Sequence, residues 1–422
     1  MRIAVASSGL GHVARGIETW ALDTAEALHA YGAEVTLFAG GAVPEAKCPL
    51  VVLPAFRRGD ARTRRLAEKS PAWTWRWQLK SAYGWEQLSF WWHLWPWLRR
   101  QKFSVLHVQD PMLAFWCRRF RRLGLLRTRE IMAHGTEETP QFLAQFRWVQ
   151  HLAPWHLEQA ERVLRSGGGL EKDSEAGDQH AETSVSAAGA RSRTGRDARQ
   201  PYWEAIPNFV DTAVFTPDTP GDLRAELGLP GEAFVLGVVA AVKRHHKRVD
   251  YAIEEFSAYL QRNPQIASAY LLIAGARTEE TDSLLRLANE KAPGRIKILL
   301  DLPRKKMPAF YRSLDVFALV SLFEMMPIAL LEAMACGIPA IVNRHPVLQW
   351  IIGSETAGGQ AAAGGMAVDM ARPGALARCL AGLSGEQLVR YGHNARARAQ
   401  QVFSKEIVIS RYLDYYRRVL EA

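Results

Sequence analysis

Residues 316–339 read VFALVSLFEMMPIALLEAMACGIP and join an apolar strand, a polar loop and a helix in one unit. The strand is expected over 316–320, where five apolar residues precede the loop. Pro327 suits the first turn of the helix because its missing N–H costs nothing there, and Gly337 with Pro339 marks the helix end. A strand followed directly by a helix is typical of a parallel α/β sheet.

The same alternation of short apolar runs and amphipathic segments recurs in two series. The first series covers 2–7, 34–39, 50–54, 105–108 and 130–133, and the second covers 234–239, 270–274, 295–300, 316–320, 340–342 and 366–368. The pattern predicts an α/β protein with two Rossmann-like, doubly wound parallel-sheet domains. Each domain carries its ligand groups at the carboxyl edge of its strands, so we expect the two edges to face a central cleft.

The length of 422 residues also favours two domains, since single cores rarely grow beyond about 250–300 residues. We expect a first domain over 1–205 and a second over 206–398. Residues 399–422 carry apolar side chains at near-helical spacing, which predicts a terminal helix that packs back on the first domain. Within the first domain, 166–200 is rich in Gly, Ser, Ala, Glu and Arg without apolar periodicity, and this predicts a disordered insert.

Composition excludes several classes of protein. No run of about 18 apolar residues is present to span a bilayer. The four cysteines are scattered without CxxC pairing, so neither a zinc site nor a disulfide framework is indicated. The chain begins with a short strand instead of a long apolar signal, and we expect a cytoplasmic protein.

The net charge of +10 comes partly from a local concentration of arginine, which indicates a polyanionic neighbour. These arginines are Arg57, Arg58, Arg62, Arg64, Arg65, Arg99, Arg100, Arg118, Arg119, Arg121 and Arg122. We expect no nucleic acid, because no recognisable nucleic-acid module accompanies them. The anionic lipid at the inner face of the membrane fits this concentration of arginine better than nucleic acid does.

The stretch from Trp73 to Arg100 contains eight tryptophans together with several basic residues. One interpretation is an aromatic helical hairpin packed into the first domain. The other is an interfacial surface, because indole rings favour the headgroup layer and basic side chains are attracted to anionic lipid. The sequence leaves both open.

Two glutamates flank the start of the helix in the opening segment. Glu324 falls in the loop, facing the expected cleft, and Glu332 falls a turn or more into the helix. The free amides at the helix start, around Pro327 and Ile328, suit a diphosphate because they point outward with the positive end of the helix dipole. Carboxylates beside a phosphate site suit hydrogen bonding to sugar hydroxyls.

A basic run, Lys243-Arg-His-His-Lys-Arg248, lies between the strand over 234–239 and a helical segment from Asp250. Such a run is usually a solvated loop. Its place at the end of a strand favours phosphate binding instead. Fixed cations there would stabilise the charge that develops on a nucleoside-diphosphate leaving group, without a metal ion.

In the first domain, Ser8-Gly-Leu-Gly-His12 follows the first strand, and Gly16 stands near the start of the next helix. A glycine loop is a weak signal alone, because most Rossmann-like domains need glycine for this turn. His134 ends the strand over 130–133. A histidine in that place is as consistent with a structural role as with a ligand role.

The opening segment and several others resemble family 4 glycosyltransferases of the GT-B fold, also described as glycosyl transferases group 1. The resemblance is carried by Glu324 and Glu332 with seven residues between them, by IPNFVDTAVF at 206–215, by 236–250, by LIAGA at 272–276 and by 304–324. It is specific over most of 206–350 and looser in the first half of the chain.

The resemblance implies roles for individual residues. Glu332 would bind the ribose hydroxyls and Glu324 the donor hexose, while Lys247 would hold the diphosphate with Lys243 or Arg244 as a second cation. His134 would touch the donor sugar. The glycine loop would close over donor and acceptor, with Gly11 on the donor side and Gly9, His12 and Gly16 on the acceptor side.

Two loops depart from the family pattern. Met325-Met326-Pro327 replaces the usual Gly-Phe-Gly, and His345-Pro-Val-Leu-Gln349-Trp350 replaces the usual Gly-Gly-x-x-Glu. Both loops would line the donor sugar, so the resemblance does not identify that sugar.

The resemblance implies a retaining glycosyltransferase that moves a hexose-type sugar from a nucleotide-diphosphate sugar, without cofactor or metal, to a glycan or lipid-linked acceptor. Synthesis of cell-surface polysaccharide or glycolipid is the expected setting. Two alternatives remain: a non-catalytic nucleotide-sugar-binding or membrane-adaptor protein with this fold, and a nucleotide-sugar epimerase. A glycogen phosphorylase-like enzyme would need a pyridoxal-lysine motif, and we find none.

Overall fold

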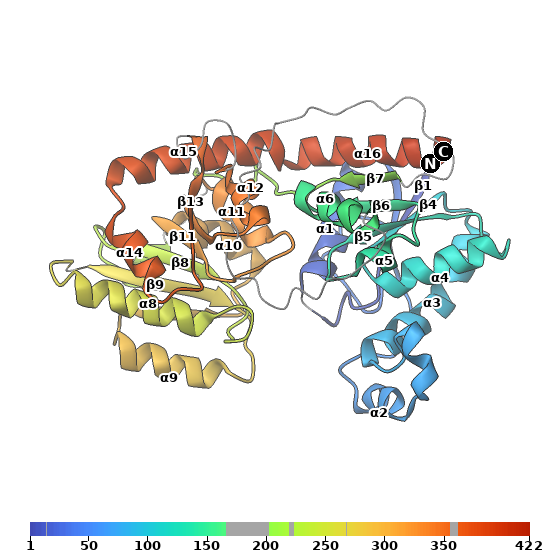
Figure 1. Cartoon of the computed structure of the whole chain (residues 1–422), viewed down its shortest axis with the longest axis horizontal. Coiled ribbons are helices and arrows are strands. Elements are labelled where there is room, and N and C mark those ends of the chain that lie inside the picture. The colour runs from blue at the N-terminus through green and yellow to red at the C-terminus, as the bar shows by residue number, and fades with distance from the viewer. Residues whose placement is uncertain (14, 166–201, 219–222, 267, 355–361) are drawn as a thin grey trace. The chain divides into compact units, whose positions relative to one another are not determined.

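The computed structural model describes residues 1–13, 15–165, 202–218, 223–266, 268–354 and 362–422 (Figure 1). The segment 166–200, for which the sequence predicts disorder, lies outside these residues. The described residues divide into two compact units. The first takes in residues up to 165 with 202–208 and 408–422, and the second takes in 209–407.

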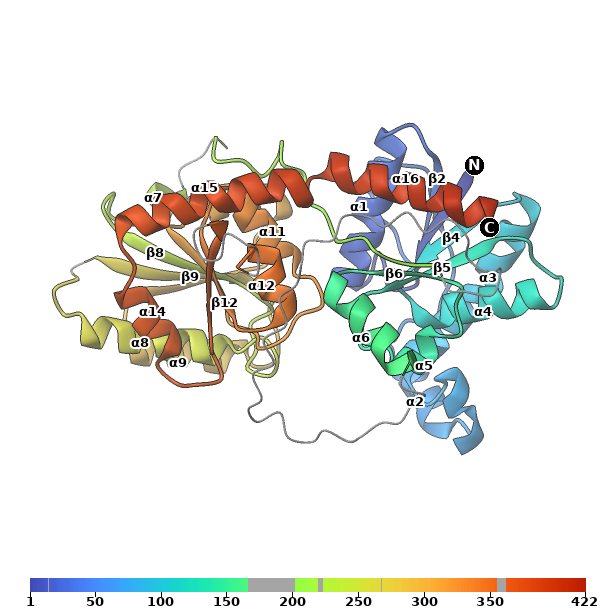
Figure 2. The same ribbon diagram turned by 45° about the horizontal axis from the view of Figure 1, so that its top comes forward.

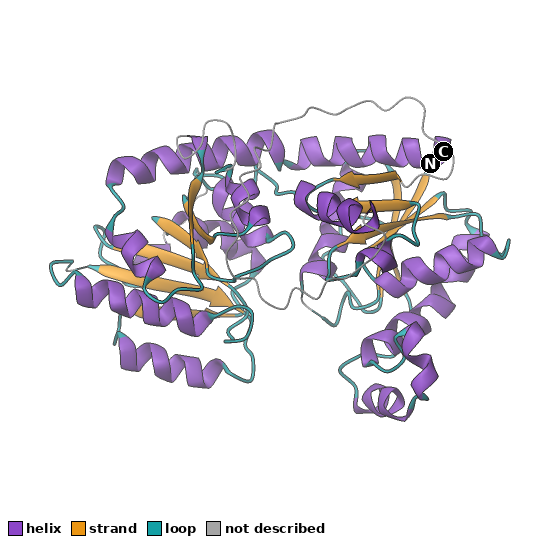
Figure 3. Cartoon of the chain, viewed as in Figure 1, coloured by secondary structure: helices purple, strands orange, loops and turns teal. Residues whose placement is uncertain are grey.

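Each unit is built on a parallel sheet (Figure 3). In spatial order, the first sheet contains β3 (Leu50–Val52), β2 (Glu34–Ala39), β1 (Arg2–Ser7), β4 (Val105–Val108), β5 (Arg129–His134), β6 (Trp148–His151) and β7 (Tyr202–Ala205). The second contains β10 (Ile296–Leu300), β9 (Ala269–Gly275), β8 (Phe234–Val239), β11 (Val316–Leu319), β12 (Ala340–Asn343) and β13 (Gly365–Val368). Both orders reverse direction once, as in doubly wound folds, which confirms the predicted fold class.

The order reverses between β1 and β4 in the first sheet and between β8 and β11 in the second. The crossovers that leave these neighbouring strands run in opposite directions. Sheets of this kind bind ligands beside the carboxyl ends of such a pair of strands.

Helices cover both faces of each sheet. Those of the first unit are α1 (Gly16–Ala30), α2 (Ala61–Lys69), the 3₁₀ helix η1 (Ala72–Trp77), α3 (Ala82–Arg100), α4 (Pro111–Arg122), α5 (Pro140–Leu143) and α6 (Pro154–Arg165). Those of the second are α7 (Leu223–Glu226), α8 (Val249–Arg262), α9 (Thr281–Lys291), η2 (Arg304–Lys306), α10 (Met307–Arg312), α11 (Ile328–Ala335), α12 (Pro346–Ile352), α14 (Ala375–Ala381) and α15 (Gly385–Val402). The last helix, α16 (Lys405–Glu421), follows them.

From Val408 onward, α16 packs against the first sheet, and it runs beside this sheet in both views (Figures 1 and 2). The hydroxyl of Tyr416 lies 2.7 Å from Nδ1 of the buried His107 on β4. The hydroxyl of Tyr412 accepts hydrogen bonds from Trp20 on α1 and Gln150 on β6. Tyrosines serve here because each ring fills the core while its hydroxyl satisfies a buried polar group.

The helix starts later than the sequence predicts. The apolar spacing predicts one helix over 399–422, whereas α15 continues to Val402 and α16 begins at Lys405. Between them the backbone of Phe403 accepts a hydrogen bond from Val210, and the N–H of Lys405 donates to Val210. This pairing takes the chain out of the helix for two residues.

Two strands of the first sheet, β6 and β7, are absent from the sequence interpretation. Both have only four residues, and β6 contains the polar pair Gln150 and His151, which breaks the apolar pattern. The pair is nevertheless fully buried. Gln150 is satisfied by His107 and by the carbonyl of Ile206, and only the assembled fold supplies such long-range partners.

The tryptophans of the 73–100 stretch separate into core and surface residues. Trp91 is fully buried among apolar residues of α3, α4 and the first sheet, so part of the stretch belongs to the core. Trp73 and Trp75 are 64% exposed and Trp92 is 55% exposed. Over the described residues, no helix has the length and apolar character needed to pass through a bilayer.

Candidate functional site

In the second unit, the loops that follow β8 and β11 meet at the point where the strand order reverses. Nζ of Lys247 lies 2.5 Å from Oε1 of Glu324, joining the two loops by an ion pair. A guanidinium N–H of Arg248 also donates to the carbonyl of Val320 at 3.2 Å. The structure therefore brings together two residues that are far apart in the sequence and that the sequence predicts for the site.

The backbone around Lys247 is held in an unusual conformation. His246 and Arg248 have φ of 66° and 49°, in the left-handed region that non-glycine residues rarely adopt. The guanidinium of Arg248 lies 4.0 Å from the ring centroid of Tyr251 on α8, which supports this turn through a cation–π contact. Residues in this region of backbone conformation are found more often at binding and active sites than elsewhere.

Glu324 is ionised over the whole physiological pH range. Its side chain is 12% exposed, and burial alone would raise the carboxyl pKa. Hydrogen bonding to His246, whose Nε2 lies 3.3 Å from Oε1, together with the charge of Lys247 outweighs burial and lowers the pKa to about 2. A fixed carboxylate beside an ammonium group can bind a hydroxyl and a phosphate at adjacent points.

Glu332 lies within α11, on the same unit of structure as Glu324. It is buried and accepts a 2.7 Å hydrogen bond from the hydroxyl of Tyr311 on α10, which fixes one of its oxygens. Pro327 occupies the N-cap position and Ile328 is the first helical residue. Because proline has no side-chain acceptor for the first N–H groups of the helix, these groups are suited to an anion.

Lys243 and Arg244, the other two cations predicted to bind the donor, differ in the contacts that their side chains make. Arg244 donates to Glu280 at 3.3 Å and to the hydroxyl of Ser283 at 2.7 Å, so its guanidinium is held against the start of α9. Lys243 is half-buried, and its ammonium group forms no ion pair with a residue that the structure describes. Lys243 is therefore better placed than Arg244 to receive a new anionic partner.

In the first unit, the glycines after β1 have clear structural reasons. A Cβ on Gly9 would lie 2.3 Å from a carboxylate oxygen of Glu18, and Gly11 has φ of +91° with the backbone of Gly41 directly behind it. A Cβ on Gly16, the first residue of α1, would meet no atom within 4 Å. Gly9 and Gly11 thus permit the turn, whereas Gly16 leaves space open at the helix start.

A buried polar cluster that the sequence does not reveal surrounds this loop. Glu86 on α3 accepts hydrogen bonds from the hydroxyl of Ser8 at 3.2 Å and from the side chain and backbone of Arg58, and it lies 3.1 Å from Nε2 of His12. Arg58 also approaches Glu18 at 3.6 Å. Burial opposes ionisation of Glu86, but the contacts with Arg58 hold its pKa below the ordinary value.

Three atoms of this cluster are buried without a hydrogen-bond partner among the described residues: Nδ1 of His12, Oε2 of Glu18 and an N–H group of Arg58. Buried polar atoms are normally satisfied in native proteins, so we expect ordered water or a ligand to bond to these three. Glu18, Arg58 and Glu86 could not be recognised from sequence because they come from three separate elements. No periodic pattern marks them.

His134 ends β5 and is 8% exposed. Its Nδ1 lies 3.0 Å from Nδ1 of His151, and its Nε2 lies 3.9 Å from Oε2 of Glu138. Burial lowers the pKa of His134 to about 4 and raises that of Glu138 to about 7. Both groups therefore favour their neutral forms over the ion pair, which leaves His134 able to donate or accept a hydrogen bond.

No cluster of three or more histidine, cysteine, aspartate or glutamate side chains suited to hold a metal ion occurs in the part of the chain that the structure describes. The polar groups of the two units instead comprise ion pairs and hydrogen-bonded carboxylates.

Two family models match the chain. "Glycosyl transferases group 1" matches residues 221–380, and "Glycosyl transferase 4-like domain" matches residues 15–168. The first match contains Lys247, Glu324 and Glu332, and the second contains Glu18, Arg58 and Glu86 of the polar cluster.

Curated relatives match over shorter regions. A D-inositol 3-phosphate glycosyltransferase of Corynebacterium jeikeium is 30% identical over 157 residues, which are 36% of this chain and 37% of that protein. A UDP-Gal:alpha-D-GlcNAc-diphosphoundecaprenol alpha-1,3-galactosyltransferase of Escherichia coli is 32% identical over 140 residues, 33% of this chain and 35% of that protein. The chain thus aligns with about a third of the length of each of these relatives.

Solved structures match over the whole fold. Sucrose-phosphate synthase of Thermosynechococcus elongatus has a TM-score of 0.69 at 19% identity and covers 100% of this chain and 99% of its own. HepE of Anabaena in complex with UDP-glucose has a TM-score of 0.66 at 14% identity and covers 98% and 99%. At these identities the likeness establishes the fold alone, and the fold is that of GT-B proteins.

Proposed function

The chain belongs to the glycosyltransferases of GT-B fold that these two family models describe, and we propose that it transfers a hexose-type sugar from a nucleoside-diphosphate donor with retention at the anomeric carbon. The acceptor in this proposal is a glycan or lipid-linked sugar, and the product enters cell-surface polysaccharide or glycolipid. We place the reaction in the cytoplasm, at the inner face of the membrane.

The observation that carries the proposal is the pairing of Lys247 with Glu324 at the carboxyl ends of β8 and β11. A donor has two polar parts that such a pair can bind, a diphosphate and a hexose. Binding would exchange the 2.5 Å contact for an ammonium–phosphate contact and a carboxylate–hydroxyl contact. Because the two groups neutralise each other before binding, neither charge is left unpaired near the protein interior.

Glu332 and α11 extend the site toward the nucleoside. We assign Glu332 to the ribose hydroxyls, because its carboxylate already accepts a hydrogen bond from Tyr311 and retains further acceptor capacity. The amides at Ile328 and the side chain of Lys243 are assigned to the diphosphate. Leaving-group charge would develop next to these fixed positive groups, which stabilise it without reorganisation and without a metal ion.

The first unit supplies the acceptor side in this proposal. The unpartnered atoms of His12, Glu18 and Arg58 suit the hydroxyl groups of a sugar, which both donate and accept hydrogen bonds. His134 is assigned to the donor sugar. Its pKa of about 4 keeps the imidazole neutral at physiological pH.

A donor-transfer assay tests the proposal. Purified protein would be incubated with nucleotide sugars that differ in base and in hexose, together with sugar-phosphate and lipid-linked acceptors, and the released nucleoside diphosphate and the glycosylated product would be measured. We expect one donor to give a product whose anomeric configuration, read from the proton coupling constant, matches that of the donor. Inversion would contradict retention. Binding of a donor with neither transfer nor epimerisation would favour the non-catalytic alternative.

A further inference from the structure

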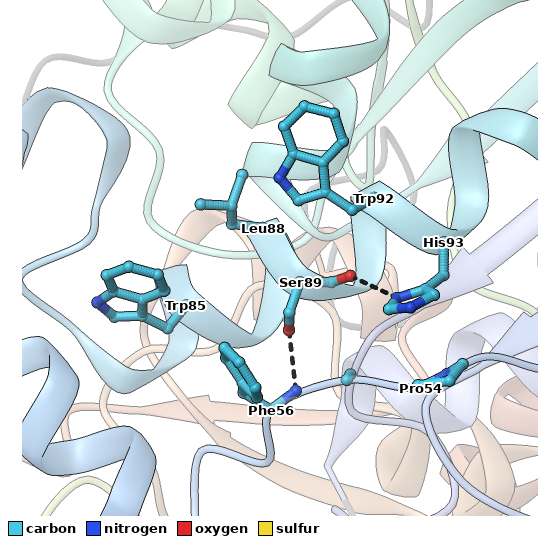
Figure 4. A pocket seen from close by; sticks show the side chains of 8 residues that line it. Pro54, Phe56, Trp85, Leu88, Ser89, Trp92 and His93 are labelled. Carbon is cyan, nitrogen blue, oxygen red and sulfur yellow. Dashed lines mark hydrogen bonds between the residues drawn. The ribbon is translucent and has the colours of Figure 1, made fainter.

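An apolar pocket of about 380 Å³ lies between the loop after β3 and the outer face of α3 (Figure 4). Its lining includes Pro54, Phe56, Trp85, Leu88, Ser89 and Trp92. Trp85, Leu88, Ser89 and Trp92 recur at spacings of three and four residues, so they share one stripe of the helix. The opposite stripe contains the buried core residues Phe90, Trp91 and Leu94.

Two polar groups of the lining, the hydroxyl of Ser89 and the indole N–H of Trp85, already form hydrogen bonds within the protein. The hydroxyl of Ser89 accepts a hydrogen bond from the backbone N–H of Phe56 at 2.9 Å and donates to the carbonyl of Glu86 at 3.0 Å. The indole N–H of Trp85 donates to the hydroxyl of Ser70 at 3.0 Å. The pocket therefore presents mainly carbon to an occupant, and a hydrocarbon is the chemistry that it accommodates.

The pocket has exposed lining residues, and the two segments beside it carry basic residues. Phe56 and Trp92 expose 41% and 55% of their surface. Arg57, which follows Phe56 directly, is exposed. The helix α2 is linked to the lining by the hydrogen bond between its C-cap residue Ser70 and Trp85, and it contains Arg62, Arg64 and Arg65, all exposed. None of these four guanidinium groups forms an ion pair with a described residue. A hydrocarbon lining with exposed cations on the adjoining segments complements a molecule that has an apolar chain and an anionic head.

The pocket is connected to the polar cluster of the first unit by two short links. The loop that contains Phe56 and Arg58 is fastened to α3 at two points, by Ser89 and by Glu86. These residues are three apart, a separation of roughly 4.5 Å along the helix axis. Glu86 in turn bonds to Ser8 of the glycine loop, so one end of the pocket adjoins the groups assigned to the acceptor.

We propose that this pocket binds the hydrocarbon chain of a lipid-linked acceptor whose phosphate head pairs with the arginines of the two adjoining segments, Arg57 and those of α2. The assignment rests on the proposed function, because it presumes that the first unit binds the acceptor. It also narrows that function, since of the two acceptor classes it selects the lipid-linked one. A second copy of this chain is the competing occupant of an exposed apolar pocket.

The test measures the affinity of the full chain for monoalkyl phosphates with chains of 4 to 12 carbons, below their micelle concentrations, by isothermal titration calorimetry. Burial of each methylene is worth about 0.8 kcal/mol, so we expect affinity to rise about fourfold per added carbon until the pocket is filled. Inorganic phosphate serves as the head without the chain and should bind far more weakly. An affinity that does not depend on chain length would overturn the proposal.

Leu88→Glu places a charge in the pocket and should abolish the dependence on chain length. Trp92→Ser removes part of the lining and should weaken binding of the longer phosphates at least tenfold. Trp73→Ser is the matched control, because Trp73 is 64% exposed and does not line the pocket. An equal loss in Trp73→Ser would show a general tryptophan effect and would contradict the assignment.

Two further measurements separate the possible failures. Donor binding, followed by thermal shift, should be unchanged in Leu88→Glu and Trp92→Ser, which also verifies that both variants are folded. If the protein transfers sugar to a soluble acceptor but binds alkyl phosphates equally at every chain length, the pocket assignment is refuted and the proposed function stands. Chain-dependent binding without any transfer would refute the function alone. A dimer in sedimentation velocity that Leu88→Glu dissociates would assign the pocket to a second copy and overturn the lipid assignment.

Discussion

Oε2 of Glu332 and the hydroxyl of Tyr311 are 2.7 Å apart, in a buried contact between α11 and α10. Tyr311 is fully buried, and burial together with the neighbouring carboxylate raises its pKa well above the ordinary value, so the hydroxyl stays protonated and donates. This contact orients the carboxylate that we assign to the ribose. The contribution of this hydrogen bond to donor affinity can be measured separately from the contribution of the Glu332 carboxylate.

Tyr311→Phe should weaken donor binding about tenfold, because a hydrogen bond to a charged group contributes about 1.5–3 kcal/mol and part of that loss affects the fold instead of the ligand. Glu332→Gln should weaken it by at least as much. The dissociation constant of the donor, from calorimetry, provides the measurement. The double variant should lose less than the sum of the single losses, since the two residues act together. Tyr259→Phe, another buried tyrosine in this unit, should bind normally, and strictly additive losses would contradict the coupling.

Glu138 gives the first unit a pH-dependent stability that can be isolated by substitution. Its pKa is raised by burial from 4.5 to about 7, so the folded state binds more protons than the unfolded state between these values. The contribution of Glu138 to stability is therefore fully present below pH 4.5 and is lost as the pH rises through 7. In Glu138→Gln, which cannot ionise, this loss should be missing.

Urea unfolding of the wild type and of Glu138→Gln at pH 5 and pH 8 measures the difference. From pH 5 to pH 8, the free energy of unfolding of the wild type should fall by about 2–3 kcal/mol more than that of the variant. His134, with a lowered pKa, acts in the opposite direction over about pH 4–6.5, and its effect cancels because both proteins contain it. Parallel pH profiles would show that Glu138 ionises normally.

Trp91 and Trp92 are adjacent in sequence but should differ sharply in their effect on stability. Trp91 is fully buried, with its ring 5.2 Å from that of Phe120, so Trp91→Ser should lower the free energy of unfolding by about 3–5 kcal/mol. Trp92 is 55% exposed, and Trp92→Ser should lower it by about 1 kcal/mol or less. Chemical denaturation followed by circular dichroism compares them, and equal losses would contradict the division into core and surface.

Removal of divalent metal should leave transfer unchanged. The proposed donor site uses Lys247, Lys243 and the amides at the start of α11 to balance the charge of the diphosphate, so no ion is required to do so. Initial rates would be compared before and after dialysis against a chelator. Activity that disappears with the chelator and returns with magnesium or manganese would refute this part of the account.

Sequence reasoning recovers the parts of the molecule that depend on local pattern. Most strands of both sheets can be predicted because each is a short apolar run, and Glu324, Glu332 and Pro327 can be placed on one strand–loop–helix unit. The basic run at 243–248 is also found at the end of a strand. The pairing of Lys247 with Glu324, however, depends on the order of the strands, which local patterns do not give.

The polar cluster around Glu86 illustrates what sequence reasoning misses. Glu86 lies in the second turn of an aromatic helix, Arg58 in a loop and Glu18 in another helix, and only the folded chain brings them together. Local pattern likewise omits β6, since Gln150 and His151 are polar residues in fully buried positions. In each case a long-range hydrogen bond offsets the burial of a polar group, and such partners are invisible until the fold exists.

The most direct test of the central claim is donor binding that depends on Lys247. A panel of nucleoside-diphosphate sugars would be added to the wild type, to Lys247→Ala and to Lys291→Ala, and the free energy of unfolding would be measured for each. Lys291 is the matched control, because it lies at the end of α9 and its ammonium group is 3.9 Å from the carboxylate of its neighbour Glu290.

For the wild type, a donor at one hundred times its dissociation constant should add about 2.7 kcal/mol of stability. Lys291→Ala should respond equally. Lys247→Ala should remain folded but lose the response at that concentration, since a charge-assisted contact to the diphosphate is worth about 3 kcal/mol. Full stabilisation of Lys247→Ala by the same donor, or a wild type that no nucleoside-diphosphate sugar stabilises, would contradict the account.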